Sequence, residues 1–141
     1  MTNVIVTDTG FAADDWAHPV TPLAELENTE AGAPALAVDL APGDDPAALQ
    51  SRLDGIDLIR IAFPSFADGR GFTHAKALRR MGFAGRLRAA GHVISDQYAM
   101  ARRCGFDEVE ISPDLAARQP EAEWKFRADW QAHDYQSRMR A

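Results

Sequence analysis

The sequence predicts a single α/β domain: a mostly parallel sheet of four or five strands with flanking helices, built from βαβ units. Three observations support this class. A length of 141 residues suits one domain, and a hydrophobic content of 46% suits a folded core. Short apolar segments rich in branched residues alternate with helical patterns, as right-handed βαβ units require. A barrel of eight strands would need a longer chain, so an open sheet is expected.

The first third of the chain has the weakest pattern. Residues 4–7 can form a short first strand. Three prolines and several acidic residues between 8 and 34 predict mostly loop, with one helical turn near 23–26. Residues 1–34 are therefore expected to be loosely structured.

A regular alternation begins near residue 35. Residues 35–40 predict a strand, and a helix should follow because Asp45 can cap it and Pro46 suits its first position. Residues 57–63 are apolar and rich in branched side chains, which is typical of a buried parallel strand. A helix over about 72–81 comes next and should end near the glycines that follow it.

The same alternation continues through the second half. Residues 86–94 contain the next strand. Ser95 can cap a helix over 96–104, and Gly105 suits the left-handed position that ends it. Residues 107–112 predict another strand, after which a serine–proline pair begins a short helix. These elements complete the predicted sheet.

The last segment, residues 120–141, is expected to be a C-terminal helix or tail. A helix here would carry aromatic side chains on two opposite faces. One face has Trp124, Ala128, Tyr135 and Met139, and the other has Phe126 and Trp130. Because one sheet cannot cover both faces, this pattern predicts a homodimer. The alternative is a helix that ends near Trp130 and is followed by an irregular tail.

Charge is distributed unevenly along the chain, whose net charge is −6. Residues 1–69 hold 12 acidic and 2 basic side chains, whereas residues 70–103 hold 1 acidic and 8 basic side chains. The acidic total argues against nucleic-acid binding, and no known nucleic-acid module is present. The central basic block can meet a small anion, an acidic partner or the acidic first third, or its arginines can simply face solvent.

The sequence also argues against a membrane protein, a secreted protein and a protein with a cysteine-bound metal. No apolar run approaches the roughly 18 residues of a membrane span, and the N-terminus lacks a secretory signal, so a cytoplasmic protein is expected. The single cysteine, Cys104, cannot form an internal disulfide or a cysteine cage for a metal, and is expected to be a buried small hydrophobe. No metal site and no cofactor are predicted, because no ligand cluster or cofactor-binding motif is found.

The loop after the strand at 57–63 is the first candidate site. Ligands of open parallel sheets bind beyond the carboxyl ends of the strands. Gly69 and Gly71 permit close approach of a ligand, the next helix directs unpaired N–H groups at the loop, and Arg70 and Thr73 add side-chain donors. Together they predict a site for an oxyanion. The alternative is a loop closed by a contact between Asp68 and Arg70.

Histidines extend this candidate site. His74 lies on the apolar side of its predicted helix, where a partly buried structural role and a role as a base are both open. His92 follows the next strand and could face His74 and Asp68 across the strand ends, assembling acid–base groups over the anion. Ser95 joins this cluster as a polar residue of the same loop, although it and Asp96 can also act only as helix-start residues.

Several short motifs follow one another along the chain. They are Phe66-x-Asp68-Gly69-Arg70, Leu87-Arg88-Ala89-x-Gly91, Asp96-Gln97, the run from Arg103 to Asp107, and Tyr135-Gln136. In these motifs the chain resembles a bacterial family of uncharacterised proteins that are described as oxidoreductases involved in sulfite reduction. The similarity is good over roughly 35–111 and poor in the first third.

The resemblance implies a cytoplasmic role in sulfur assimilation. It identifies no catalytic residues, and relatives often have an acidic residue in place of His92. Electron chemistry usually needs a cofactor. We therefore expect an accessory protein that binds an oxyanion at the 68–74 loop or docks onto sulfite reductase or phosphosulfate reductase. The alternative is a small oxidoreductase or anion-processing enzyme that acts at the same loops.

Overall fold

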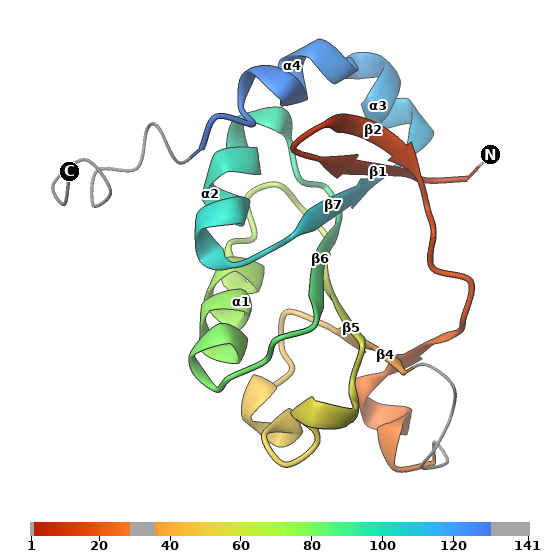
Figure 1. The fold of residues 1–141 in the computed structure, drawn as a ribbon, viewed down its shortest axis with the longest axis vertical. Helices are drawn as coiled ribbons and strands as arrows, with labels where there is room; N and C mark the ends of the chain where they lie inside the picture. Colours follow the sequence, from red (N-terminus) through yellow and green to blue (C-terminus); the bar gives the residue numbers. More distant parts are fainter. Residues whose placement is uncertain (1, 29–35, 131–141) are drawn as a thin grey trace, which may run out of the picture.

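The structure, a computed structural model, describes residues 2–28 and 36–130, which form one α/β domain around a mixed seven-stranded sheet (Figure 1). The order of the strands across the sheet is β2-β1-β7-β6-β5-β4-β3. Neighbours from β3 to β7 are parallel, whereas β1 pairs antiparallel with both β2 and β7. The strands are β1 (Val4–Thr7), β2 (Gly10–Ala13), β3 (Val20–Pro22), β4 (Ala37–Leu40), β5 (Leu58–Phe63), β6 (Arg86–Gly91) and β7 (Glu108–Ile111).

Helices connect the parallel strands. The α-helices are α1 (Arg70–Arg80), α2 (Tyr98–Cys104), α3 (Pro113–Arg118) and α4 (Glu121–Phe126). The 3-10 helices are η1 (Leu23–Asn28), η2 (Pro46–Leu49), η3 (Leu53–Gly55) and η4 (Ser95–Gln97). Because β4 to β7 lie side by side in chain order, right-handed crossovers bring their connecting helices to the same face of the sheet. Figure 1 shows α1 and α2 together on that face.

The two faces of the sheet differ in chemistry. Alternate strand residues point to the helices and form the apolar core, among them Val38, Ile59, Ile61, Leu87, Val109 and Ile111. The intervening residues point to the other face, and several are charged: Asp39, Arg60, Arg86, Arg88, Glu108 and Glu110. The helix-free face is therefore a polar network and not a second hydrophobic layer.

The connection from β2 to β3, residues 14–19, crosses this charged face. β2 and β3 lie at opposite edges of the sheet although they are consecutive in sequence. Figure 1 shows the connection as an extended segment on the side opposite α1 and α2. We call residues 14–19 the strap.

Local signals after residue 35 are confirmed. The Asp45 carboxylate accepts a hydrogen bond from the N–H of Ala47 (3.0 Å), and Gly105 ends α2 with φ of 112°. The Ser112 hydroxyl accepts from the N–H of Leu115 (3.1 Å) at the start of α3. The prediction that Ser95 caps a helix is wrong, because η4 already begins at Ser95 and Ile94 is its N-cap residue.

The first third and the tail differ from prediction. The expected four or five strands were too few, because β2 and β3 form within a segment predicted to be mostly loop. β2 reads GFAA and β3 reads VTP, and neither contains the run of branched apolar residues that indicates a strand. In the tail, α4 ends at Phe126, and the predicted Tyr135 and Met139 lie outside the described residues. The homodimer therefore stays a prediction. No helix in the described part of the chain has the length and apolarity needed to cross a membrane.

Candidate functional site

The two loops of the predicted anion site do share one rim of the sheet. β5 and β6 are parallel neighbours, with Phe63 level with Gly91. The N–H of His92 donates to the carbonyl of Phe63 (2.8 Å), and the Gln97 amide donates to the carbonyl of Phe66 (2.7 Å). The loop after β5 and the loop after β6 are therefore held together by hydrogen bonds.

Arg70 and Asp68 close their loop onto itself. The guanidinium donates to both oxygens of the Asp68 carboxylate, at 3.0 and 2.7 Å, and the Arg70 N–H donates to it at 3.2 Å. The hydrogen bonds from Arg70 lower the pKa of Asp68 to about 2, so this carboxylate stays charged. An oxyanion at Arg70 would have to compete with this internal carboxylate.

Gly71 and His74 have structural roles in this segment. A methyl group at Gly71 would lie 2.5 Å from the Phe63 ring, so this glycine is required by the packing of α1 on β5. Gly69 has an ordinary φ of −85°, and Thr73 is exposed. The His74 ring is 2.9 Å from the carbonyl of Pro42, which fixes α1 against the loop after β4.

His92 and Ser95 make no direct hydrogen bond with the charged residues of the 68–74 loop within the described structure. Among the described residues, no hydrogen bond or ion pair joins His92 to Asp68, Arg70 or His74. Ser95 is buried and its N–H donates to the side chain of Gln119 (2.8 Å). His92 is exposed and lines a hollow of about 500 Å³ together with Phe66, Ile94, Leu115, Arg118 and Gln119.

Sequence reasoning missed Arg118 and Gln119. Both come from the end of α3, which tertiary packing brings beside η4. No motif or spacing in the sequence marked them, because they are separated from the predicted loops by β7. The rim is therefore completed by a third segment of the chain.

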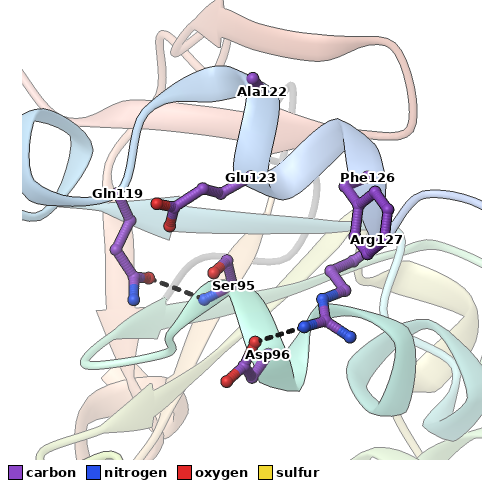
Figure 2. A pocket seen from close by; sticks show the side chains of 7 residues that line it. All are labelled: Ser95, Asp96, Gln119, Ala122, Glu123, Phe126 and Arg127. Atoms are coloured by element: carbon purple, nitrogen blue, oxygen red, sulfur yellow. Dashed lines mark hydrogen bonds and ion pairs between the residues drawn. The ribbon is translucent and has the colours of Figure 1, made fainter.

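A second hollow lies between η4 and α4 and has a volume of about 470 Å³. Figure 2 shows its lining: Ser95, Asp96, Gln119, Ala122, Glu123, Phe126 and Arg127. The Arg127 guanidinium donates to the Asp96 carboxylate (2.8 Å) across its mouth. The Phe126 side chain is 77% exposed.

A third hollow of about 470 Å³ adjoins the second one over α2. It shares Asp96, Phe126 and Arg127 with it and adds Met100 and Arg103, of which Met100 is 49% exposed. We call these five residues the α2–α4 surface. It combines two exposed apolar side chains with two arginines and one carboxylate, and a second carboxylate, Asp129, also lines the third hollow.

Comparison with known proteins identifies a family. A family model described as a bacterial protein of unknown function (DUF934) matches residues 37–141. The chain belongs to this family. The match covers the structure from β4 through α4, which includes the rim and the α2–α4 surface. No curated protein matches the chain.

In this DUF934 member, Asp8 fixes the β1–β2 turn to α2. The Tyr98 hydroxyl, which belongs to a buried ring, donates to the Asp8 carboxylate, and Arg102 donates to the same group at 3.1 and 3.2 Å. The Arg102 guanidinium also lies over the ring of Trp130, 4.8 Å from its centre. The cluster joins three parts of the chain that are distant in sequence.

Asp8 is expected to stabilise the fold in a pH-dependent manner. Burial raises the pKa of Asp8, but hydrogen bonds from Arg102 and Tyr98 outweigh this effect and leave the pKa below its ordinary value of 3.8. The stabilisation is therefore fully present above that value and is lost as the pH falls through the lower folded pKa. Asp8→Asn should cost on the order of 1 kcal/mol at pH 7 in urea unfolding, and the difference should shrink below about pH 4.

Asp54→Asn is the control for this prediction, because Asp54 is an exposed carboxylate in η3. Its unfolding should match the wild type at every pH. A difference between Asp8→Asn and wild type that stays constant down to pH 2 would show that the charge of Asp8 is not involved.

Cys104 and possible metal ligands are the remaining candidates for chemistry. Cys104 is buried, and burial raises the pKa of its thiol, so the prediction of a structural cysteine is confirmed. Across residues 2–28 and 36–130, no group of three or more His, Cys, Asp or Glu side chains is placed to hold a metal ion.

Proposed function

We propose that this protein is an accessory of assimilatory sulfite or sulfate reduction that docks onto a reductase through the α2–α4 surface. The observation that carries the proposal is the contrast between two aromatic residues of α4. Trp124 is 1% exposed in the core, whereas Phe126 is 77% exposed. Aromatic residues, methionine and arginine are the residue types enriched at protein interfaces.

The surroundings of Phe126 support docking by a protein. Met100 lines the third hollow together with Phe126. Arg103 and Arg127 line the same hollow. The guanidinium of Arg127 also lies 5.3 Å from the Phe126 ring centre, which orients the ring. A partner that inserts an apolar side chain between Met100 and Phe126 would place its carboxylates within reach of Arg103, whereas Arg127 is already paired with Asp96.

The sulfur connection rests on the family resemblance and not on geometry. It points to sulfite reductase or phosphosulfate reductase as the partner. The sequence has no nucleotide, flavin, haem or cluster motif, which favours an accessory role over an electron-transfer enzyme.

The test is a binding measurement with both purified reductases at low salt. Immobilised wild type should bind one of them, and Phe126→Ala should weaken that binding at least tenfold. Phe66→Ala is the matched control, because Phe66 is an exposed phenylalanine (59%) that lines the rim hollow and is not part of the α2–α4 surface. The proposal fails if neither reductase binds, or if the Phe126 and Phe66 variants bind alike.

A second candidate function is oxyanion binding at the rim. The hollow that His92 shares with Arg118 supports it, since a guanidinium and an imidazole face one cavity at the carboxyl end of β6. The predicted residues Asp68, Gly69, Arg70, Gly71, Thr73 and His74 border the same rim. Calorimetry with sulfite, sulfate and an adenylyl sulfate should show binding that Arg118→Ala removes. Loss in Arg70→Ala instead would favour the 68–74 loop, and no heat with any anion would exclude both positions.

A further inference from the structure

The strap covers only part of the charged face of the sheet. Asp14 pairs with Arg88 (3.2 Å) and Asp15 pairs with Arg86 (2.8 Å), so the strap crosses β6 over its amino-terminal half. The carboxyl-terminal half of β6, which contains Ala90 and Gly91, lies beyond these ion pairs. The strap therefore leaves the carboxyl ends of the central strands open on this face.

Small side chains make the open part a hollow. Ala62 of β5 and Ala90 of β6 are cross-strand neighbours on this face and form its floor. Two residues earlier in the same strands, Arg60 and Arg88 are cross-strand partners on this face, and Arg60 lines the cavity. The resulting cavity of about 490 Å³ lies within the size range of small-molecule sites, at the sheet edge where parallel sheets bind ligands.

The polar groups around this cavity are rigidly held. Arg60 donates to both oxygens of Asp39, at 2.6 and 2.8 Å. The Glu110 carboxylate, whose side chain is only 8% exposed, accepts from Asn3 and from Arg88, both at 2.9 Å. Groups fixed on strands and held by such hydrogen bonds keep a constant geometry for a ligand.

Carboxylates exceed guanidinium groups in the lining. Among the described residues that line the cavity, Asp39, Asp44 and Glu110 are carboxylates and Arg60 is the one cation. Arg60 and Arg88 compensate Asp39 and Glu110. Within the described residues, Asp44 has no ion pair, and its carboxylate accepts only the N–H of Ala41 (2.8 Å). Among the described lining residues, Asp44 is thus the carboxylate without a countercharge, which favours a positively charged ligand.

We propose that this cavity is a binding site for a small organic cation, of the primary amine or guanidinium class. The cationic group of the ligand pairs with Asp44 and approaches the Asp39 carboxylate. The apolar part of the ligand lies on Ala62 and Ala90. This site is separate from the α2–α4 surface and does not depend on docking to a reductase.

The test is a titration of the isotope-labelled full chain with agmatine and putrescine, followed by amide chemical shifts. We expect saturable shifts at the ends of β4, β5 and β6 with millimolar or tighter affinity. Asp44→Asn should weaken binding at least fivefold. Ala62→Leu should abolish it by filling the floor, and an unchanged melting temperature would show that the variant is folded. Ala62 is exposed, so this change does not disturb the core.

Two further arms make the result decisive. Asp54→Asn removes an equal charge from a distant exposed position and should leave binding unchanged. Sulfate and inorganic phosphate should not produce shifts at these strand ends. Chemical shifts that do not saturate, or anions that bind at these strand ends instead, would overturn the proposal. So would equal weakening by Asp44→Asn and Asp54→Asn, or unaltered binding to Ala62→Leu.

Discussion

Arg88→Ala is expected to lower the free energy of unfolding by about 3–5 kcal/mol, the usual cost of breaking a buried ion pair. Arg88 is 1% exposed at the centre of the charged face. Its guanidinium donates to Glu108 (2.6 Å) and Glu110 (2.9 Å) and pairs with Asp14 of the strap. Its removal takes one of two guanidinium partners from the nearly buried Glu108 and leaves the nearly buried Glu110 with only the longer contact to Arg60 (3.4 Å) among the cations of the described residues. Urea unfolding followed by circular dichroism measures the effect.

Two further variants identify the cause. Arg86→Ala should cost no more than about 1 kcal/mol, because Arg86 is partly exposed and water can replace it at Glu108. Arg88→Met combined with Glu108→Gln and Glu110→Gln should recover much of the loss, since no unpaired charge is then buried. A single Arg88→Ala change that costs less than 1 kcal/mol would show that the network does not stabilise the sheet.

Trp124→Ala is expected to cost about 3–5 kcal/mol, as for other large-to-small changes in a core. Its indole ring packs edge-on against the ring of Tyr98, 6.2 Å between centres, and its N–H donates to the carbonyl of Gln119 (2.9 Å). α4 has only 6 residues, so its position depends on this anchor. The variant should therefore also weaken binding at the α2–α4 surface.

Phe126→Ala on the same helix is the comparison for Trp124→Ala. It should change the free energy of unfolding by less than about 0.5 kcal/mol, because its ring is mostly in water. Thermal and urea unfolding of both variants give the contrast. Equal destabilisation by the two changes would mean that Phe126 is packed in solution and is not available to a partner.

The parallel half of the fold could be predicted from the sequence because its signals are local. Branched apolar strands, the cap at Asp45, the stop at Gly105 and the start at Ser112 each act within a few residues. β2 and β3 could not be predicted, because partners define them. For example, the N–H of Phe11 at the edge strand β2 is satisfied by the carboxylate of Glu121 in α4 (2.8 Å), 110 residues away.

The part of the candidate site that could be predicted is the part that the order of the parallel strands determines. The pairing of β5 with β6 brings the two loops to one rim, as the sequence predicted. The sequence also placed Trp124 and Phe126 on opposite helix faces, but only tertiary packing determines which of them is buried. Arg118 reaches the rim through the packing of α3, and no periodicity contains that information.

The strap limits the shapes that the sheet can adopt. It joins edge strands that are six strand spacings apart, about 29 Å in a flat sheet. The seven steps from Ala13 to Val20 reach at most about 25 Å. A flat sheet is thus geometrically forbidden, and opposite corners must curl toward the charged side. The short N-terminal connection therefore limits how flat the sheet can be, and a proteolytic cut within it would remove this limit while β2 and β3 keep their pairing with β1 and β4.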